Sequence, residues 1–180
     1  MEQKTIFITG ASRGIGKSIA LLFASRGYHT FLNCSSSVDE LKKLRAYITE
    51  KYHTPCTLVP GNVGNPDHVR AIYNKIYQEC THLDVLVNNA GISYINLLTD
   101  MTDEDWNRII QTNLSSVFYC CRWFPNVPEK SSIFLPCGGH PVLPVKLHTL
   151  LPSPASTDLP KRSPKNSHRV TFRLMRLPAE

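Results

Sequence analysis

The chain has 180 residues, enough for one domain of ordinary size. Hydrophobic residues make up 42% and charged residues 19%, a composition that excludes wholesale disorder. No apolar run approaches the 18 residues of a membrane span, and the N-terminus lacks the basic segment and cleavage site of a secretion signal. The six cysteines show neither CxxC pairing nor zinc spacing, so we interpret them as reduced thiols of a cytoplasmic protein without a metal site.

Charge and proline content divide the chain near residue 124. Residues 1–124 carry 12 Lys and Arg against 11 Asp and Glu. Residues 125–180 carry 8 against 3, together with 10 of the 13 prolines, which break helices and interior strands. We therefore predict an ordered domain over residues 1–123 and an irregular, disordered basic segment over residues 124–180.

Strand-like and helix-like segments alternate through the first 124 residues. Short apolar, β-branched runs predict buried strands at residues 4–9, 29–34, 56–60 and 83–87. Apolar residues at helical spacing predict helices at residues 15–26, 38–52, 66–80 and 102–113, and the apolar stretch 114–124 continues the last of these. Strands that alternate with helices indicate an α/β protein whose parallel sheet is covered on both faces.

A glycine-rich turn joins the first predicted strand to the first predicted helix. Gly10, Gly14 and Gly16 follow the spacing G-x-x-x-G-x-G. Glycines allow the backbone to approach a pyrophosphate, and a helix N-terminus offers free N–H groups and a positive dipole. A glycine turn alone is often only a tight turn, but its position between strand and helix favours a dinucleotide site.

Three further polar elements follow later strands. Gly61-Asn62-Val63 comes after the third strand, Asn88-Asn89-Ala90-Gly91 comes directly after the fourth, and Asn113 interrupts an apolar stretch. Ligands of open α/β sheets bind outside the carboxyl ends of the strands, which is where the first two elements lie. Taken singly, they are also compatible with an Asn/Gly turn and a buried structural amide.

Together these four elements resemble the short-chain dehydrogenase/reductase family, and the stretch 91–114 is most similar to its 3-oxoacyl-carrier-protein reductases. The resemblance covers residues 4 to about 124 and implies an incomplete doubly wound Rossmann fold with parallel strands in the order 3-2-1-4. It implies that the cofactor pyrophosphate lies against Gly10, Ser12, Gly14, Ile15 and Gly16, the adenine against Asn62 and Val63, and the ribose and nicotinamide near Asn89, Ala90 and Gly91. It assigns Asn113 as the catalytic Asn that holds a water in a proton relay.

The choice of cofactor follows from charge. NAD enzymes place an acid at the end of the second strand, which binds the ribose 2′-hydroxyl. Here that stretch contains Ser35 and no acid before Asp39, while Arg13 in the glycine turn can face a 2′-phosphate. NADP(H) is therefore favoured over NAD(H), with Ser35 and Arg13 as cofactor-binding candidates; the alternative is that Arg13 is simply solvated.

The catalytic half of the family pattern is missing. The family needs a Ser, a Tyr that donates a proton and a Lys that lowers the pKa of that Tyr, in a Y-x-x-x-K motif. No tyrosine follows Tyr119. One Y-x-x-x-K runs from Tyr47 to Lys51, but it falls on the helix between the second and third strands, and we interpret it as a chance match on a solvated face.

The DNA that encodes the basic segment is compatible with family sequences when it is translated in a shifted reading frame. Read from the third base of each codon, Ser132–Gly139 is compatible with Asn-Ile-Ser-Ser-Val-Trp-Gly, the family's fifth strand with its catalytic Ser. In the same frame His148–Ser153 is compatible with Tyr-Ser-Ala-Ser-Lys, and residues 161–175 with the family's next helix and strand. We therefore interpret residues from about 124 onward as an out-of-frame translation, caused by a mutation or by a sequencing error.

The sequence thus predicts a truncated NADPH-dependent oxidoreductase that is inactive as written. Its intact parent is expected to be a homo-oligomer that reduces a 3-oxoacyl thioester or, alternatively, a ketone on a modified protein side chain. A third possibility is a non-catalytic protein whose basic segment binds an anion such as RNA. We favour neither nucleic acid nor a membrane as a partner, because an out-of-frame excess of basic residues is accidental. Residues 131–135 are expected to pair as a stray strand beside strand four, which otherwise becomes an edge.

Overall fold

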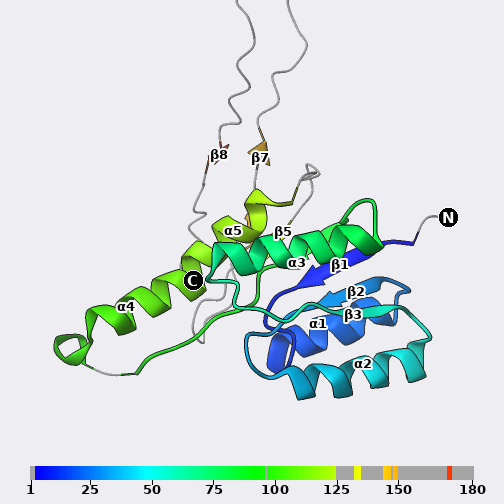
Figure 1. Cartoon of the computed structure of the whole chain (residues 1–180), viewed down its shortest axis with the longest axis horizontal. Coiled ribbons are helices and arrows are strands. Elements are labelled where there is room, and N and C mark those ends of the chain that lie inside the picture. Colours follow the sequence, from blue (N-terminus) through cyan, green and yellow to red (C-terminus); the bar gives the residue numbers. More distant parts are fainter. Residues whose placement is uncertain are drawn as a thin grey trace, which may run out of the picture.

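The computed structural model describes residues 3–95 and 97–124, together with four short strands between residues 132 and 171. Four strands form one parallel sheet in the order β3-β2-β1-β4, as the sequence analysis predicted (Figure 1). Their bounds are β1 Thr5–Ile8, β2 His29–Leu32, β3 Cys56–Leu58 and β4 Val85–Val87. Each strand lies within its predicted range.

Helices cover both faces of the sheet. Helices α1 (Gly14–Ala24) and α2 (Val38–Tyr52) lie on one face, and α3 (Pro66–Glu79) and α5 (Ser116–Arg122) lie on the other (Figure 1). Because side chains alternate along a strand, Ile6 and Ile8 enter the core against α1 and α2, whereas Phe7 enters the core against α3 and α5. This pattern confirms the doubly wound half fold.

Local signals in the sequence place the helix ends. Gly27, just beyond α1, has φ +83°, a left-handed conformation that glycine adopts without strain. Asn65 caps α3, since its Oδ1 accepts hydrogen bonds from the backbone N–H groups of Asp67 (2.9 Å) and His68 (3.3 Å). Thr102 caps the helix that begins at Asp103, since its hydroxyl accepts the N–H of Asp105 at 3.2 Å.

The predicted helix from Thr102 to Phe124 consists of three segments. α4 spans Asp103–Ile110, the π-helical turn η2 spans Gln111–Ser115, and α5 follows. A short 3₁₀ turn, η1 (Leu98–Asp100), precedes α4 and was not predicted. Single π turns inside α-helices are rare and occur frequently at functional sites, and this one contains Asn113.

Four short strands lie within the basic segment. β5 (Ser132–Phe134) pairs antiparallel with β6 (Pro144–Lys146), and β7 (His148–Thr149) pairs antiparallel with β8 (Val170–Thr171). β5 lies close to β4, but its ladder is with β6, so the predicted pairing beside strand four is wrong in its partner. Phe124, the first residue of the predicted disordered segment, is buried in the core beside α3, and the remaining residues of that segment lie outside the described residues. None of the described helices is both long and apolar enough to cross a bilayer.

Candidate functional site

Four loops meet at the carboxyl edge of the sheet because the four strands are parallel. They follow β1 (residues 9–13), β2 (33–37), β3 (59–65) and β4 (88–95). Every predicted cofactor-binding residue lies in one of these loops or in the first turn of α1. The structure therefore brings the predicted residues to one edge, which is where ligands of open α/β sheets bind.

The glycine turn is packed tightly against the loop after β4. A Cβ atom on Gly10, which has φ +64°, would lie 2.9 Å from Ala90 Cα. A Cβ on Gly16 would lie 2.4 Å from the Gly10 carbonyl oxygen and 2.5 Å from Asn89 Nδ2. Both positions therefore require glycine for close approach. Gly14, at φ +56°, is different, because a Cβ there would meet nothing within 4 Å, and its surroundings are open.

Asn89 and Thr9 join these two loops. The Asn89 side-chain amide donates hydrogen bonds to the carbonyl oxygens of Thr9 and Gly10, both at 3.0 Å. The Thr9 hydroxyl accepts the backbone N–H groups of Asn89 and Ala90, both at 2.9 Å. The resemblance placed Asn89 near the ribose and nicotinamide; in the structure, its amide group holds the glycine turn.

Sequence reasoning missed Asn33, which organises the other half of this edge. Asn33 is only 1% exposed. Its Nδ2 donates to the carbonyl oxygens of Val59 (2.8 Å) and Gly61 (3.0 Å), and its own carbonyl accepts the N–H of Ala11 at 2.8 Å. Asn33 thus connects the loops after β1, β2 and β3. The sequence does contain a signal for Asn33, because it is a polar residue directly after an apolar strand.

The N-terminus of α1 is open to an anion. Arg13 occupies the capping position and makes no side-chain capping bond, and the first turn of α1 contains no acidic residue. By contrast, the first turns of α2, α3 and α4 all contain acidic residues, which suit the positive end of a helix dipole. The open space at Gly14 adjoins these N–H groups. This geometry fits the pyrophosphate of a dinucleotide.

The loop after β2 presents no carboxylate to the site edge. Ser35 is exposed, and Cys34 is buried. Burial raises the pKa of the Cys34 thiol, although the N–H groups of Ser37 and Ser36 oppose that shift. The first acid, Asp39, lies in the first turn of α2, and its Oδ1 is 2.9 Å from Lys42 Nζ.

The loop after β3 has a buried and an exposed component. Val63 is buried in the core, so its side chain is not free to contact an adenine. Asn62 Oδ1 accepts the N–H of Gly64 at 2.9 Å, and the Asn62 N–H donates to His68 Nδ1 at 3.2 Å.

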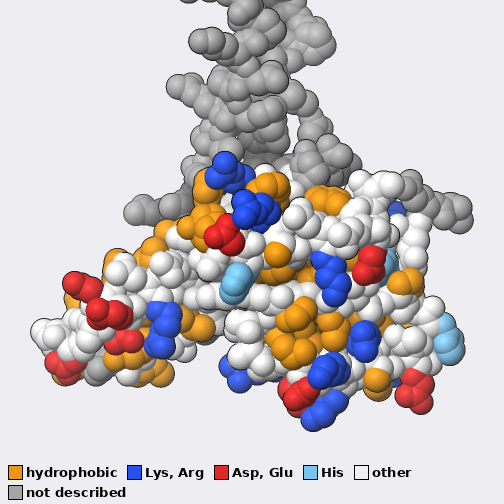
Figure 2. All heavy atoms as spheres, viewed as in Figure 1, with side chains coloured by type: hydrophobic (Ala, Val, Ile, Leu, Met, Phe, Trp, Pro, Cys, Tyr) orange, Lys and Arg blue, Asp and Glu red, His pale blue; other side chains and the backbone are white. Residues whose placement is uncertain are grey.

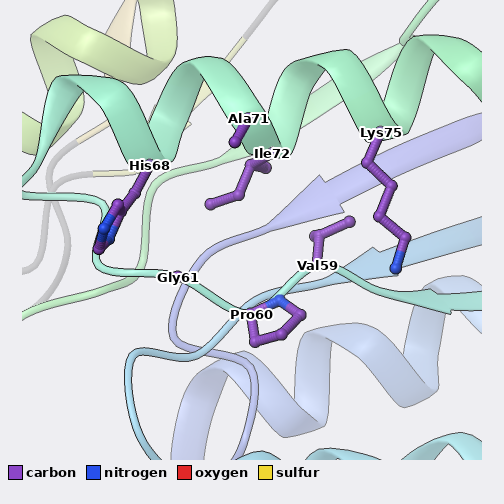
Figure 3. Close-up of a pocket in the computed structure, with 7 residues that line it drawn as sticks. All are labelled: Val59, Pro60, Gly61, His68, Ala71, Ile72 and Lys75. Carbon is purple, nitrogen blue, oxygen red and sulfur yellow. The ribbon is translucent and has the colours of Figure 1, made fainter.

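An open pocket of about 380 Å³ lies beside this loop, between it and α3 (Figure 3). Its walls come from Val59, Pro60, Gly61, His68, Ala71, Ile72 and Lys75. The ammonium group of Lys75 is already engaged, because it donates to the Leu58 carbonyl oxygen at 2.9 Å. None of the predicted cofactor-binding residues lines this pocket.

Asn113 anchors the loop after β4. Its Oδ1 accepts the N–H of Ile92 at 2.9 Å, and its Nδ2 donates to the Ile92 carbonyl oxygen at 2.8 Å. The π turn also touches the loop after β3, since a Cβ on Gly64 would lie 3.3 Å from the Gln111 carbonyl oxygen. The π turn therefore connects two of the four loops of the site edge.

The Y-x-x-x-K sequence from Tyr47 to Lys51 lies on α2, away from the site edge. Lys51 Nζ donates to the Tyr47 hydroxyl at 2.7 Å on the exposed surface of α2, and this hydrogen bond raises the pKa of Lys51. α2 starts near the site edge, and Tyr47 is nine residues along it, about 14 Å away at 1.5 Å per residue. The pair is a surface i, i+4 contact. The segments predicted to hold the out-of-frame Ser, Tyr and Lys lie mostly outside the described residues.

Comparisons with known proteins agree with this geometry. The sequence model of the family described as short chain dehydrogenase matches residues 4–131. The 3-oxoacyl-(acyl-carrier-protein) reductase FabG of Staphylococcus aureus is 40% identical over 117 residues, which cover 65% of this chain and 47% of that protein.

Solved structures give the same result. An alcohol dehydrogenase from the archaeon Thermococcus sibiricus, complexed with 5-hydroxy-NADP, matches with a TM-score of 0.65 and 32% identity over 68% of this chain and 52% of that one. The L-sorbose reductase of Gluconobacter frateurii, complexed with NADPH and L-sorbose, matches with a TM-score of 0.65 and 29% identity over 68% of this chain and 46% of that one. The chain thus spans about half the length of these proteins. With the family match over residues 4–131 and the strand order 3-2-1-4, it belongs to the short-chain dehydrogenase family.

Proposed function

We propose that residues 1–123 are the NADP(H)-binding half of a reductase that acts on the carbonyl of a 3-oxoacyl thioester, and that the chain as written does not catalyse this reaction. The observation that carries the proposal is the open, acid-free N-terminus of α1 beside Gly14, with the glycine turn held against Asn89. The similarity to 3-oxoacyl-(acyl-carrier-protein) reductases supports the substrate class.

Charge at the site edge supports NADP(H) over NAD(H). Asp39, the first acid after β2, is bonded to Lys42 on the surface of α2. Arg13 is exposed at the start of α1, and no carboxylate of the described residues forms an ion pair with it. A guanidinium without a carboxylate partner suits a 2′-phosphate. Solved relatives complexed with NADPH and with an NADP derivative are consistent with this choice.

The chain supplies binding groups but no proton donor for the reaction. A bound NADPH would provide the hydride. The residues of this chain would bind and orient it: the α1 N-terminus at the pyrophosphate, Arg13 and Ser35 at the 2′-phosphate, and Ala90 and Gly91 on the nicotinamide side. Asn113 offers a neutral amide, which is not a proton donor at useful pH. Carbonyl reduction therefore stops for lack of the Tyr, Lys and Ser of the family.

Cofactor binding is tested by titrating the purified chain with NADPH and with NADH and following nicotinamide fluorescence. We expect weak binding of NADPH that is at least tenfold tighter than binding of NADH. Arg13→Ala should remove most of this preference, because it removes the charge that faces the 2′-phosphate. Arg26→Ala, an exposed arginine beyond the end of α1, is the matched control and should leave the preference unchanged. Equal affinities in the unmodified chain would refute the choice of NADP(H).

Activity is tested by comparing the chain with its frame-corrected version. Both are assayed for NADPH oxidation with a 3-oxoacyl thioester. We expect turnover from the corrected chain only, because general acid catalysis alone contributes about 10²–10⁴-fold. Comparable turnover by the two proteins would contradict the proposed loss of function, and activity in neither would contradict the proposed substrate.

A further inference from the structure

The groove between α3 and the loop after β3 has an apolar middle and two polar ends. Figure 3 shows His68 and Lys75 at opposite ends of the α3 wall, with Ala71 and Ile72 between them. His68 and Lys75 are seven residues apart, which is about 10 Å along the helix axis at 1.5 Å per residue. The volume of about 380 Å³ lies within the range of about 300–1,000 Å³ that is usual for ligand pockets. The groove therefore has the size of a small-molecule site.

The Lys75 end of the groove carries a positive charge that no carboxylate neutralises. The Lys75 ammonium group has three N–H donors, and the Leu58 carbonyl oxygen, at 2.9 Å, accepts from one of them. Glu79, one turn further along α3, is engaged elsewhere, because its Oε2 accepts from the Thr57 hydroxyl and lies 3.7 Å from His29 Nε2. Among residues 3–95 and 97–124, no acid forms an ion pair with Lys75. This end is therefore suited to an anion.

The His68 end of the groove offers a hydrogen-bond donor. His68 Nδ1 accepts the N–H of Asn62 at 3.2 Å, so the proton of the ring lies on Nε2. His68 is exposed, and the carboxylate of the adjacent Asp67 is paired with Arg70 at 3.1 Å. The Nε2–H group is therefore suited to an oxygen acceptor of a ligand.

The backbone at the β3 edge favours a small ligand over an extended peptide. Lys75 covers the Leu58 carbonyl oxygen, and Pro60 has no N–H, and both features oppose the addition of another strand. Gly61 keeps the floor of the groove free of a side chain, since a Cβ there would lie 3.1 Å from Ile72 Cδ1. The groove is therefore shaped for a narrow apolar group and not for a strand.

We propose that this groove binds a small amphipathic carboxylate. The carboxylate would lie at Lys75, and an apolar chain would lie over Ala71 and Ile72. An oxygen at the far end of the chain would accept from His68 Nε2. One ammonium group balances one negative charge, which favours a carboxylate over a phosphate dianion. None of the predicted cofactor-binding residues lines the groove, so this inference does not depend on the proposed function.

Binding is tested by calorimetric titration of the purified full chain with octanoate. Acetate, which lacks the chain, and 1-octanol, which lacks the charge, are the comparison probes. We expect octanoate to bind at least tenfold more tightly than either, because it alone matches both the apolar middle and Lys75. Equal affinities for octanoate and 1-octanol would overturn the proposal, since the charge of Lys75 would then contribute nothing.

Two lysine variants test the position of the carboxylate. Lys75→Met removes the charge and keeps an apolar stem, so it should weaken octanoate binding at least tenfold and leave 1-octanol binding unchanged. The unchanged binding of 1-octanol would show that the groove is still folded. Lys43→Met, on the exposed surface of α2, removes the same charge and should change neither affinity. Equal losses of octanoate affinity in both variants would indicate general attraction to a basic protein and would overturn the proposal.

Substitutions on α3 test the position of the chain. Ala71→Phe fills the groove from an exposed position and should weaken the binding of both octanoate and 1-octanol at least tenfold. We expect 8-hydroxyoctanoate to bind more tightly than octanoate, and His68→Phe should remove that difference because it removes the Nε2–H donor. Unchanged binding in Ala71→Phe would place the ligand elsewhere and would overturn the proposal.

A titration with octanoate in the presence of NADPH separates the groove from the cofactor edge. We expect the affinity for octanoate to be the same with and without NADPH. Competition between the two would place octanoate at the cofactor edge and would overturn this inference. A chain that binds octanoate but not NADPH supports the groove and refutes the proposed cofactor function, and the reverse result refutes the groove alone.

Discussion

Two amides, Asn33 and Asn89, set the spacing of the site loops at the scale of single residues. Each uses both of its N–H donors on backbone carbonyl oxygens, Asn33 on Val59 and Gly61 and Asn89 on Thr9 and Gly10. A neutral amide suits this role because a carboxylate in its place would face two carbonyl oxygens without a donor. The loops are therefore held by hydrogen bonds before any ligand binds.

Substitution of Gly16 tests the close approach of the glycine turn to Asn89. We expect Gly16→Ala to weaken NADPH binding at least tenfold and to lower stability by about 1–3 kcal/mol, the usual cost of overpacking. The reason is that its Cβ would lie 2.4 Å from the Gly10 carbonyl oxygen. Thermal unfolding and a fluorescence titration measure the two effects.

Gly14→Ala is the matched substitution, because its Cβ would meet no atom within 4 Å. We expect its free energy of unfolding to fall by about 1–2 kcal/mol because of the strain at φ +56°, with no displacement of Asn89. Equal losses of cofactor affinity in the two variants would show that steric contact with Asn89 is not what makes Gly16 necessary.

His29 makes stability depend on pH. Its Nε2 lies 3.0 Å from the Thr57 hydroxyl and 3.7 Å from Glu79 Oε2, and its ring stacks on Phe31. Burial lowers the pKa of His29 below 6.5, and the charge of Glu79 opposes this only in part. The unfolded chain therefore takes up the proton first, and the contribution of His29 to the free energy of unfolding falls as pH drops below about 6.5.

We expect denaturant unfolding at pH 7.5 and 5.5 to show a larger loss of stability for the unmodified chain than for His29→Gln, which keeps polar contacts but does not titrate. Contributions that are common to both proteins cancel in the comparison. The same loss in both would show that His29 is protonated in the folded state as readily as in the unfolded state.

At the scale of elements, the helical run from α4 to α5 has a buried inner side and an exposed apolar outer side. Its inner side buries Val117 and Cys120, and the buried Tyr73 hydroxyl of α3 donates to the Cys120 carbonyl oxygen at 2.8 Å. Its outer side leaves Leu114 and Phe118 60% and 56% exposed. Hydrophobic side chains also gather on the surface over α5 in Figure 2. An exposed apolar face of this kind favours self-association.

We expect the double substitution Leu114→Glu and Phe118→Lys to increase the soluble yield and reduce light scattering. These exposed positions are one helical turn apart, so the new side chains can pair, and stability should change by no more than about 0.5 kcal/mol. Val117→Lys, on the buried side of the same helix, is the control and should destabilise the fold. Unchanged scattering in the double variant would exclude this face as the cause of association.

At the scale of the whole molecule, the described residues form the four-stranded half of a short-chain dehydrogenase fold, with the four site loops at one edge of its sheet. Both faces of its four strands are covered, and the core is divided into one cluster under α1 and α2 and another under α3 and α5. The four site loops follow these strands at the edge where ligands of open α/β sheets bind.

The DNA sequence of the gene tests whether the basic segment is an out-of-frame translation. We expect the DNA that encodes residues 148–153, read from the third base of each codon, to give Tyr-x-x-x-Lys in the same frame that gives the catalytic Ser near residue 134. Independent sequencing of the locus then distinguishes a mutation from a sequencing error. Any other reading at codon 148 ends the frameshift hypothesis.

The sequence by itself determined the type and order of the elements and the edge where the site lies. Short apolar, β-branched runs identified the four strands, and helical periodicity identified their helices. Polar residues directly after the strands marked the loops, because all of these are local properties of the chain. The strand order followed from the family motifs, and the structure confirmed it.

Only the tertiary structure decided what individual site residues do. Asn89 holds Thr9 across 80 residues of sequence, Asn33 bridges three loops, Val63 turns into the core, and Asn113 lies in a π turn that fixes Ile92. These outcomes depend on which backbone groups approach after the sheet has assembled. A side chain's hydrogen-bond partner is set by that three-dimensional approach, which the periodicity of a single segment does not encode.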